Sequence, residues 1–536
     1  MTLVFSIITP VFDPPEDVLR ACIDSVLQQD YPHLELCLVD DASPSPHVRR
    51  VLEEARQRDP RVRVLFREAS GGIVAASNDA LAMATGDFVA LVDHDDLLEP
   101  RALGVINHHI ESRESDDVDY LYTDEDQLAP DGTFIKAFYK PDWSPERFRS
   151  QMYTCHLSVI RRSLALALGG FRTGFDGSQD YDLILRVTEQ ARRIEHVAEV
   201  LYHWRILATS TANNAEAKPY PYDARVRAVE SHCERIGLAA TVTKLALPGT
   251  HRVHRAVTGE PKVSIIMPTG GTKRRVWGRE RVLVTEVVRS VLEKSSYTNL
   301  EFVIVADRTT AATTIADLHD LLGDRLRLIW FDGPFHFSRK TNLGAAHATG
   351  EFLLLMNDDM EVISEDWFET MLGLAQDPTV GMVGSKLLFS DGRLQHAGHF
   401  YGDSRPHHTF SHFSASEPGP SCMLQIDREC SGVTAACALM RADVWHKAGG
   451  LTDQLPNSYN DVDLCLKVRH LGYRIIWTAH AQLYHFESMS RDSTVTIEEL
   501  RFIQTRWDEQ LRVDPYGNPA LDGARPDWVV RSAVGC

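Results

Sequence analysis

Short apolar runs alternate along the chain with segments whose apolar residues recur every three or four positions. The continuous apolar runs, typical of buried strands, cover residues 4–9, 34–39, 62–66 and 88–92. The segments with helical spacing cover residues 17–28, 48–55 and 74–83. This alternation predicts an α/β fold, in which helices cover both faces of a mostly parallel sheet.

The pattern occurs twice in the chain. Phe5-Ser-Ile-Ile-Thr-Pro returns as Val263-Ser-Ile-Ile-Met-Pro, and Ser178-Gln-Asp-Tyr-Asp-Leu returns as Tyr459-Asn-Asp-Val-Asp-Leu. Spacing is kept as well, since Asp41 and Asp95 are 54 residues apart and Asp307 and Asp359 are 52 apart. Such matches in register predict two copies of one domain, with a period far too long for a solenoid.

Turn residues between 247 and 261 suggest where the two copies are joined. The predicted boundaries are an N-terminal domain over residues 1–250, a C-terminal domain over 260–490 and an extension over 491–536. Within the extension, residues 497–511 have helical spacing, and turns containing proline and glycine follow.

Composition excludes several classes of protein. With 536 residues, 43% hydrophobic and 24% charged, the chain has ordinary globular composition. Its net charge of −19 disfavours nucleic acid as a partner. No apolar run approaches the roughly 18–20 residues that span a bilayer. Nine irregularly spaced cysteines indicate free thiols in a reducing compartment, so we expect a cytoplasmic protein.

Acidic residues follow two of the predicted strands in each copy. Asp93-His-Asp-Asp comes directly after residues 88–92, and Asn357-Asp-Asp stands at the matching place. Carboxylates crowded at a strand end repel one another unless a cation binds, and oxygen ligands suit Mg²⁺ or Mn²⁺. The alternative is an acidic turn before a helix, which the recurrence in the second copy makes less attractive. Asp41 and Asp307, at another strand end, are predicted to face the base or ribose of a nucleotide.

Two further residue types recur at matched distances. His203 and His485 each follow Leu-Tyr late in their copy, which favours a role such as a third metal ligand over an incidental histidine. Asp180 and Asp461 each open a predicted helix. Either is a plausible helix cap, and the same helix end favours the ionised carboxylate that a general base needs.

Other candidates are weaker. Asn78 and Asn342 recur in a helix before the acidic strand, where a simple surface amide is equally plausible. His396-Ala-Gly-His399 has no obvious carboxylate partner and is predicted at most to line a pocket. The second copy also contains an insertion near residues 273–279 that is rich in Lys and Arg; it could meet a phosphate or an anionic acceptor, although such loops are more often simply solvated.

Taken together, these motifs resemble the inverting glycosyltransferases of family 2, which have the GT-A fold. The resemblance lies in the strand-end Asp-x-Asp, Gly71-Gly-Ile-Val-Ala-Ala-Ser-Asn, Tyr122-Thr-Asp-Glu-Asp, Lys140-Pro-Asp-Trp-Ser-Pro and Asn460-Asp-Val-Asp-Leu-Cys-Leu. It covers nearly residues 4–490 and is similar to bacterial tandem members associated with O-antigen, rhamnan and other surface polysaccharides.

The resemblance implies that a nucleotide-diphosphate sugar lies across the strand ends. The implied donor contacts are Thr9, Pro10, Asp41 and Asn78 in the first copy and Pro268, Asp307 and Asn342 in the second. The implied ligands of one Mn²⁺ or Mg²⁺ per site are Asp93, Asp95 and His203, and then Asp359 and His485. Asp180 and Asp461 would each deprotonate an acceptor hydroxyl. Asn357 departs from the motif because an amide replaces its first carboxylate.

The leading hypothesis is therefore a bifunctional glycosyltransferase that uses dTDP-rhamnose or a UDP-sugar and extends an oligosaccharide or lipid-linked glycan. It would act in the cytoplasm, with at most peripheral contact at the inner face of the membrane. One alternative is a catalytic domain joined to a degenerate, acceptor-binding domain. A sugar nucleotidyltransferase is disfavoured, because Thr9-Pro-Val-Phe replaces the expected Gly-rich phosphate loop. A carbohydrate-binding protein would have no reason to keep the acidic residues twice.

Overall fold

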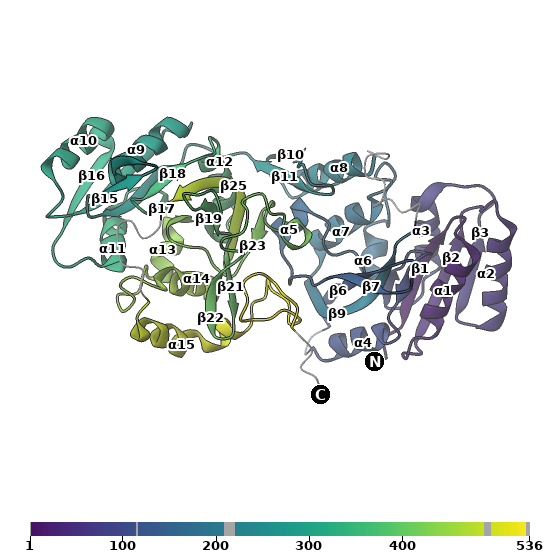
Figure 1. Ribbon diagram of the computed structural model, residues 1–536. Helices are drawn as coiled ribbons and strands as arrows, with labels where there is room; N and C mark the ends of the chain where they lie inside the picture. The colour runs from purple at the N-terminus through teal and green to yellow at the C-terminus, as the bar shows by residue number, and fades with distance from the viewer. Residues whose placement is uncertain (1, 114–115, 208–219, 487–494, 532–536) are drawn as a thin grey trace. The chain divides into compact units, whose positions relative to one another are not determined.

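The computed structural model describes residues 2–113, 116–207, 220–486 and 495–531. The chain divides into two compact units, coloured purple to blue and teal to yellow in Figure 1. The first unit comprises Met1–Trp143 and Gln151–His251, and the second comprises Ser144–Ser150 and Arg252–Cys536. The short helix α5 (Pro145–Ser150) therefore belongs to the second unit, although its sequence lies within the first copy.

The first unit is built on one mixed sheet with the strand order β3-β2-β1-β4-β8-β6-β9-β5, and β7 pairs with β6. Its strands are β1 (Phe5–Val11), β2 (Leu34–Asp40), β3 (Val62–Phe66), β4 (Phe88–Leu91), β5 (Leu97–Leu98), β6 (Val118–Leu128), β7 (Phe134–Phe138), β8 (Ser158–Arg161) and β9 (Arg193–Arg205). Strands β3, β2, β1 and β4 are parallel, whereas β8 pairs antiparallel with β4 and β6.

Helices cover this sheet. They are α1 (Glu16–Leu27), α2 (Pro46–Arg58), α3 (Gly72–Met83), α4 (Ala102–Glu111), α6 (Arg162–Ala167), α7 (Gln179–Gln190) and α8 (Tyr220–Arg235). Phe5 and Ile7 of β1 share a core with the apolar residues of α1, α2 and α4. Ile8 points to the other side, since successive strand residues alternate, and it too is buried. Burial on both faces explains why the strand sequence is apolar without interruption.

The second unit repeats this plan with the order β16-β15-β12-β17-β24-β19-β25-β18, and β20 and β23 attach to β19 and β25. Its strands are β12 (Val263–Thr269), β15 (Leu300–Asp307), β16 (Leu326–Phe331), β17 (Phe352–Met356), β18 (Met360–Val362), β19 (Val380–Leu388), β20 (Leu394–His396), β23 (Arg428–Glu429), β24 (Cys437–Arg441) and β25 (Arg474–His485). Outside this sheet lie two hairpins, β13 (Lys273–Val276) with β14 (Arg279–Val282) and β21 (His399–Gly402) with β22 (Arg405–His408). Strand β10 (Ala240–Lys244) belongs to the first unit, and β11 (His251–Arg255) begins at that unit's last residue.

Two cores flank the second sheet. Its helices are α9 (Leu283–Lys294), α10 (Ala312–Leu322), α11 (Phe337–His347), α12 (Trp367–Ala375), α13 (Ala442–Ala448), α14 (Asn460–His470) and α15 (Ile497–Arg512), with 3-10 turns η2 (Gly323–Arg325) and η3 (Pro420–Cys422). Ile265 packs with α9, α10 and α12, whereas the next residue, Ile266, packs with α11, α13 and α14. Helix α15 covers α14 through Ile503, Trp507 and Leu511.

The predicted fold class, two α/β units with mostly parallel sheets, is confirmed. The elements expected in residues 4–92 and the helix expected at 497–511 are all present, with ends shifted by three residues at most. The antiparallel strand β8, which lies between β4 and β6, was not anticipated. The inclusion of residues 144–150 in the second unit was not anticipated either, because the sequence pattern does not indicate which sheet a short helix packs against.

The same hydrogen-bonded glutamate occurs in both units. Ser6 Oγ donates a hydrogen bond to Glu35 at 2.6 Å, and the backbone N–H of Thr85 donates to the same carboxylate. In the second unit Ser264 and the N–H of Thr349 donate to Glu301, the latter at 2.6 Å. The carboxylate thus joins the start of the first strand to the turn before the acidic strand.

This hydrogen-bonded glutamate makes the stability of the second unit depend on pH. Burial disfavours the ionised Glu301, but the hydrogen bonds from Ser264, Thr349 and Lys262 outweigh it and lower its pKa to about 2. Because the folded pKa lies below the unfolded value, the stabilisation is present above about pH 4.5 and is lost as the pH falls toward 2. Glu301→Gln should lower the melting temperature at pH 7 and reduce its dependence on pH between 5 and 3.

Differential scanning calorimetry measures both effects. The exposed Glu365, replaced by Gln, is the matched control and should leave the melting temperature and its pH dependence unchanged. If the melting temperature of Glu301→Gln falls with pH as steeply as that of the wild type, this carboxylate contributes nothing to the pH dependence of stability.

Candidate active site

In the first unit a cavity of about 360 Å³ opens at the carboxyl ends of β1, β2 and β4. Pro10, Asp41, Asp93 and Asp95 line it. A smaller cavity shares Pro10 and Asp93 with the first and extends to Asp180. The structure therefore brings together five of the residues that the sequence singled out. Thr9 is fully buried in β1 beside them, where it pairs with Leu38 of β2.

Asp41 is held by the beginning of α3. Its carboxylate accepts hydrogen bonds from the N–H groups of Gly71 and Gly72, each at 2.8 Å, and from Ser70 Oγ at 2.7 Å. Arg67 Nε lies 3.0 Å away. A helix N-terminus attracts a carboxylate in this way. Asp41 thus shapes the wall of the cavity as well as lining it.

Next to Asp93 lies a histidine that the sequence analysis missed. Ligand atoms of Asp93, Asp96 and His156 lie within 4.8 Å of one another. Burial disfavours the charged form of His156, but the hydrogen bond and charge of Glu125, with Asp93 and Asp96 nearby, raise its pKa to about 9. No motif marked His156, because it precedes β8 and reaches Asp93 only when β8 pairs with β4.

His203 lies outside this group, and its role as a metal ligand stays a prediction. Its Nδ1 lies 2.6 Å from Asp126 and its Nε2 lies 3.3 Å from Glu99. The cause is strand register. His203 pairs with Leu97, which comes nine residues after Phe88 at the start of β4. His485 pairs with Met360, which comes only eight residues after Phe352, the equivalent of Phe88. A shift of one residue turns a side chain to the opposite face of the strand.

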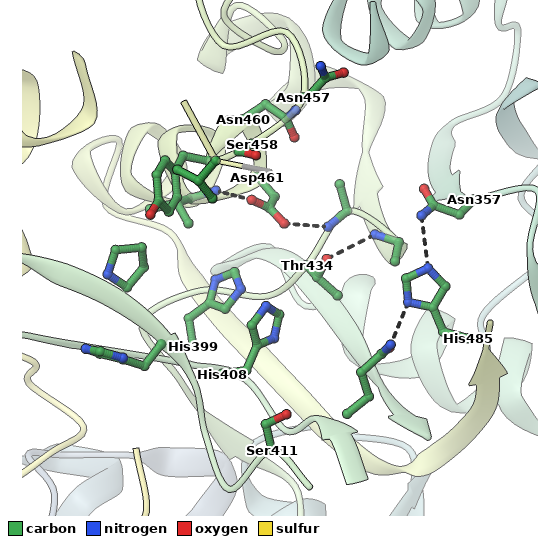
Figure 2. Close-up of a pocket in the computed structure, with 18 of the residues that line it drawn as sticks. Asn357, His399, His408, Ser411, Thr434, Asn457, Ser458, Asn460, Asp461 and His485 are labelled. Atoms are coloured by element: carbon green, nitrogen blue, oxygen red, sulfur yellow. Dashed lines mark hydrogen bonds between the residues drawn. The ribbon is translucent and has the colours of Figure 1, made fainter. Parts of the chain in front are cut away.

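The second unit has a larger pocket of about 400 Å³, shown in Figure 2. Asn357 and His485 lie on one side of it, Asp461 lies on another, and Thr434 lies between them. His485 Nε2 is 3.2 Å from Asp359 Oδ1 and 3.2 Å from Asn357 Nδ2, and His485 Nδ1 is 2.7 Å from Gln395 Oε1. Here the predicted histidine and the strand-end motif do meet.

Asp461 lies in the first turn of α14. Its Oδ1 accepts the N–H of Val462 at 2.9 Å and its Oδ2 accepts the N–H of Ala435 at 3.3 Å. Asp180 has the same place in α7, where it accepts the N–H of Tyr181 at 2.8 Å. In both units the helix thus presents a carboxylate toward the strand-end residues. Asp182 and Asp463, two residues further on, are fully buried in ion pairs.

The extension supports this arrangement in a way that the sequence did not reveal. Glu499 of α15 accepts the N–H groups of Asn457 and Ser458, at 3.0 and 2.9 Å. It also forms a capping box with Thr496. The loop that leads into Asp461 is therefore fixed from outside the repeated domain. The signal in the sequence was the Thr-x-x-Glu pattern, but it identifies only a helix start.

Asp307 and Pro268 lie near the ends of the paired strands β15 and β12, and a buried lysine joins Asp307 to Thr269, the residue after Pro268. Lys340 Nζ is 2.8 Å from both Asp307 Oδ1 and the Thr269 carbonyl oxygen, and Thr269 Oγ1 donates to Asp358 at 2.6 Å. Burial, with the charge of Asp359, raises the pKa of Asp358 to about 7. Lys340 stands two residues before Asn342, at a position that Ala76 occupies before Asn78.

The two asparagines hold the fold rather than face the cavities. Asn78 donates to the Phe171 carbonyl at 2.9 Å and accepts the N–H of Phe171 at 2.8 Å. Asn342 forms the same pair of bonds with Leu451, at 2.8 and 2.9 Å. Both amide ends thus attach the helix to the turn that follows the Gly-Gly pair, and a contact of these residues with the donor stays a prediction.

Of the 396–399 motif, His399 lines the second pocket, whereas His396 is buried beside it. Ring nitrogens of His396, His399 and His408 lie within 4.8 Å of one another. His396 Nε2 accepts the N–H of Thr434 at 3.2 Å, which leaves its proton on Nδ1, 2.9 Å from His408 Nδ1. Burial lowers the pKa of His399 to about 3. Burial also lowers the pKa of His396, so His396 and His399 are both neutral near pH 7.

The described helices include none that is both long and apolar enough to span a membrane. The eight cysteines among the described residues form no disulfide.

Residues 6–168 and 264–448 each match the family described as Glycosyl transferase family 2. The chain belongs to this family, with one match in each copy of the repeat. Both matches contain the strand-end motif of their unit, Asp93 to Asp95 and Asn357 to Asp359.

Among curated relatives, the O-antigen biosynthesis protein RfbC of Myxococcus xanthus is 37% identical over 98% of this chain, which covers 41% of that protein. The uncharacterized protein y4gI of Sinorhizobium fredii is 39% identical over 99% of this chain and 59% of its own length. The chain thus spans about half the length of these relatives. A solved structure of S. aureus TarS 1-349 with UDP-GlcNAc is 21% identical over 43% of this chain, with a TM-score of 0.36.

Proposed function

We propose that the chain is a metal-dependent, inverting glycosyltransferase with two active sites, one in each of the domains 1–250 and 260–490. It transfers a sugar from a nucleotide-diphosphate donor to a hydroxyl of a bacterial surface glycan. The observation that carries the proposal is the repeated placement of a helix-start carboxylate, Asp180 or Asp461, beside a strand-end acidic motif. Membership of family 2 and the name of the M. xanthus relative support the reaction class and the kind of glycan.

The donor groups fit a divalent cation in both units. In the first unit Asp93 and Asp95 offer carboxylate oxygens at the cavity, and in the second Asp359 and His485 lie 3.2 Å apart. Oxygen ligands with one imidazole suit Mn²⁺, and Mg²⁺ accepts the carboxylates. A bound cation would supply Lewis-acid stabilisation of the departing diphosphate.

The chain's own residues account for the rest of the reaction. Pro10 and Asp41 line the cavity in which the nucleotide would lie in the first unit, and Pro268 and Asp307 would contact it in the second. Asp180 or Asp461 takes the proton from the acceptor hydroxyl while the hydroxyl oxygen attacks the anomeric carbon of the donor sugar. The attack comes from the face opposite the leaving nucleoside diphosphate, so a single displacement inverts the configuration there.

A second candidate follows from Asn357, because an amide stands where the first unit has Asp93. An amide oxygen is a weaker ligand than a carboxylate, and the amide nitrogen of Asn357 faces His485. The second unit would then bind acceptor without transferring sugar.

A donor panel tests the proposal. Nucleotide release should be measured from dTDP-rhamnose and UDP-sugars, with Mn²⁺ or Mg²⁺ and an oligosaccharide acceptor. We expect release with one donor, its loss in EDTA, and its restoration on adding Mn²⁺. Asp95→Ala and Asp359→Ala should each remove metal-dependent nucleotide binding in their own unit, read by calorimetry with the free nucleotide. Equal nucleotide affinity with and without metal in the wild type would refute the ligand assignment.

A further inference from the structure

The second unit carries a basic hairpin that the first unit lacks. Strands β13 and β14 follow β12 directly and pair antiparallel, with Arg274 opposite Arg281 and Val276 opposite Arg279. In the first unit only residues 12–15 separate β1 from α1, and they form no strand. The hairpin is thus an insertion at the edge of the shared fold, and the repeated core does not require it.

Four cations of this hairpin are exposed, and one of them, Arg275, stands opposite Glu280 in the strand pair. Lys273, Arg274, Arg275 and Arg279 all lie in solvent, and within the described part of the chain none forms an ion pair. Glu280 is the only acidic residue in the two strands. Arg281 is different, because it is partly buried and pairs with Glu361 at 2.9 Å. A patch of unneutralised positive charge on a chain of net charge −19 attracts anions locally.

A tryptophan occupies the tip. Trp277 and Gly278 both have positive φ, 45° and 78°, as the two central residues of a type I′ hairpin turn do. The indole is 46% exposed, yet its Nε1 donates to the Ser390 carbonyl at 2.9 Å. Its ring meets those of Tyr484 and Phe486 edge-on, with centroids 5.1 and 5.0 Å away. The tip is therefore a fixed surface with an aromatic face, not a loose loop.

One of these contacts places the hairpin near the second pocket. Trp277 is bonded to the Ser390 carbonyl, and the preceding residue, Phe389, lines that pocket. Basic side chains around an exposed tryptophan are the combination that binds the headgroup layer of anionic membranes.

We propose that the β13–β14 hairpin docks the second unit onto an anionic phospholipid bilayer. The arginines and the lysine contact lipid phosphates, and the exposed part of Trp277 lies at the headgroup level. Docking would bring the rim of the second pocket to the bilayer surface. The inference concerns binding alone, and it stands whether or not the chain proves to be a transferase.

Vesicle co-sedimentation of the full chain tests the proposal. The wild-type chain should bind phosphatidylcholine vesicles that contain about 30% phosphatidylglycerol and should dissociate from them at high salt. It should not bind vesicles of pure phosphatidylcholine. The variant R274E/R279E should lower the partition coefficient roughly 30-fold, at about fivefold per lost cation. This variant should fold, because a glutamate at position 274 faces Arg281 and replaces a like-charge pair with an opposite pair. Circular dichroism checks that it does.

The matched control is R56E/R327E, which changes the net charge equally at two exposed arginines that lie far from the hairpin in sequence. It should bind vesicles as wild type does. Equal loss in both double variants would overturn the proposal, because net charge alone would then explain binding. Binding of the wild-type chain to a soluble sulfated polysaccharide but not to vesicles would also overturn the proposal, since the partner would then be a glycan.

Discussion

Asp461→Asn should abolish sugar transfer by the second unit, and Asp180→Asn should abolish transfer by the first, while each variant still binds donor nucleotide. With an acceptor specific for one unit, we expect the corresponding rate to fall at least about 100-fold, within the 10²–10⁴ range for loss of a general base. If one acceptor serves both units, the loss should occur in two steps, with only the double variant inactive.

The reason lies in the placement of the two carboxylates. Each occupies the first turn of a helix, where the N-terminal dipole stabilises negative charge, and each lines a cavity with residues of the strand-end motif. An asparagine keeps the size of Asp461 and one of its two backbone hydrogen bonds but accepts no proton from a hydroxyl. Catalysis should therefore fall while the fold and the donor affinity are kept.

Exposed aspartates close by provide the controls. Asp176→Asn and Asp453→Asn change the same charge without touching either cavity and should keep full activity. The second candidate function predicts another outcome, in which Asp180→Asn removes all turnover and Asp461→Asn removes none. Full activity in both single variants and in the double variant would exclude both carboxylates as the base.

Glu429→Ala should destabilise the second unit by about 3–5 kcal/mol, the cost of breaking a buried ion pair from one side. Glu429 is fully buried and pairs with Arg474, while it also accepts the N–H of Glu146 at 3.1 Å. Glu146 in turn pairs with Arg255 and with Arg149, the latter at 2.7 Å. Removing Glu429 leaves its partly buried partner Arg474 with only Glu146 and Asp377 as counter-charges.

The electrostatics of this network support the expectation. Burial disfavours a charged Arg474, but Glu429 and Glu146 outweigh it and raise the pKa of Arg474. Likewise, burial disfavours ionised Glu146, but Arg255, Arg149 and Arg474 outweigh it and lower its pKa. The network also attaches α5 to the second unit, so the variant should loosen residues 144–150.

Urea denaturation measures the loss, fitted with two transitions because the chain has two units. Hydrogen exchange should rise in residues 144–150. Asp391→Ala removes an exposed ion pair with Arg393 and should cost less than about 1 kcal/mol. If Glu429→Ala costs no more than this control, the network does not stabilise the unit.

The sequence alone determined the class of fold and the repeat. Strands such as β1 and β12 are buried on both faces, so their apolar runs are unbroken, and helices such as α1 show one apolar face. Both signals are local and survive without knowledge of the tertiary structure. The positions of Asp93, Asp180 and Asp461 could also be predicted, because they follow strand ends or helix starts that the sequence marks.

Only the tertiary structure decided which of these residues meet. His203 and His485 look alike in sequence, but one residue of register turns His203 toward Asp126 and leaves the place near Asp93 to His156. Asn78 and Asn342 recur because they hold a turn, and Lys340 and Glu499 act through partners distant in the chain. Strand register and long-range pairing depend on how whole elements pack, and no short window of sequence records that packing.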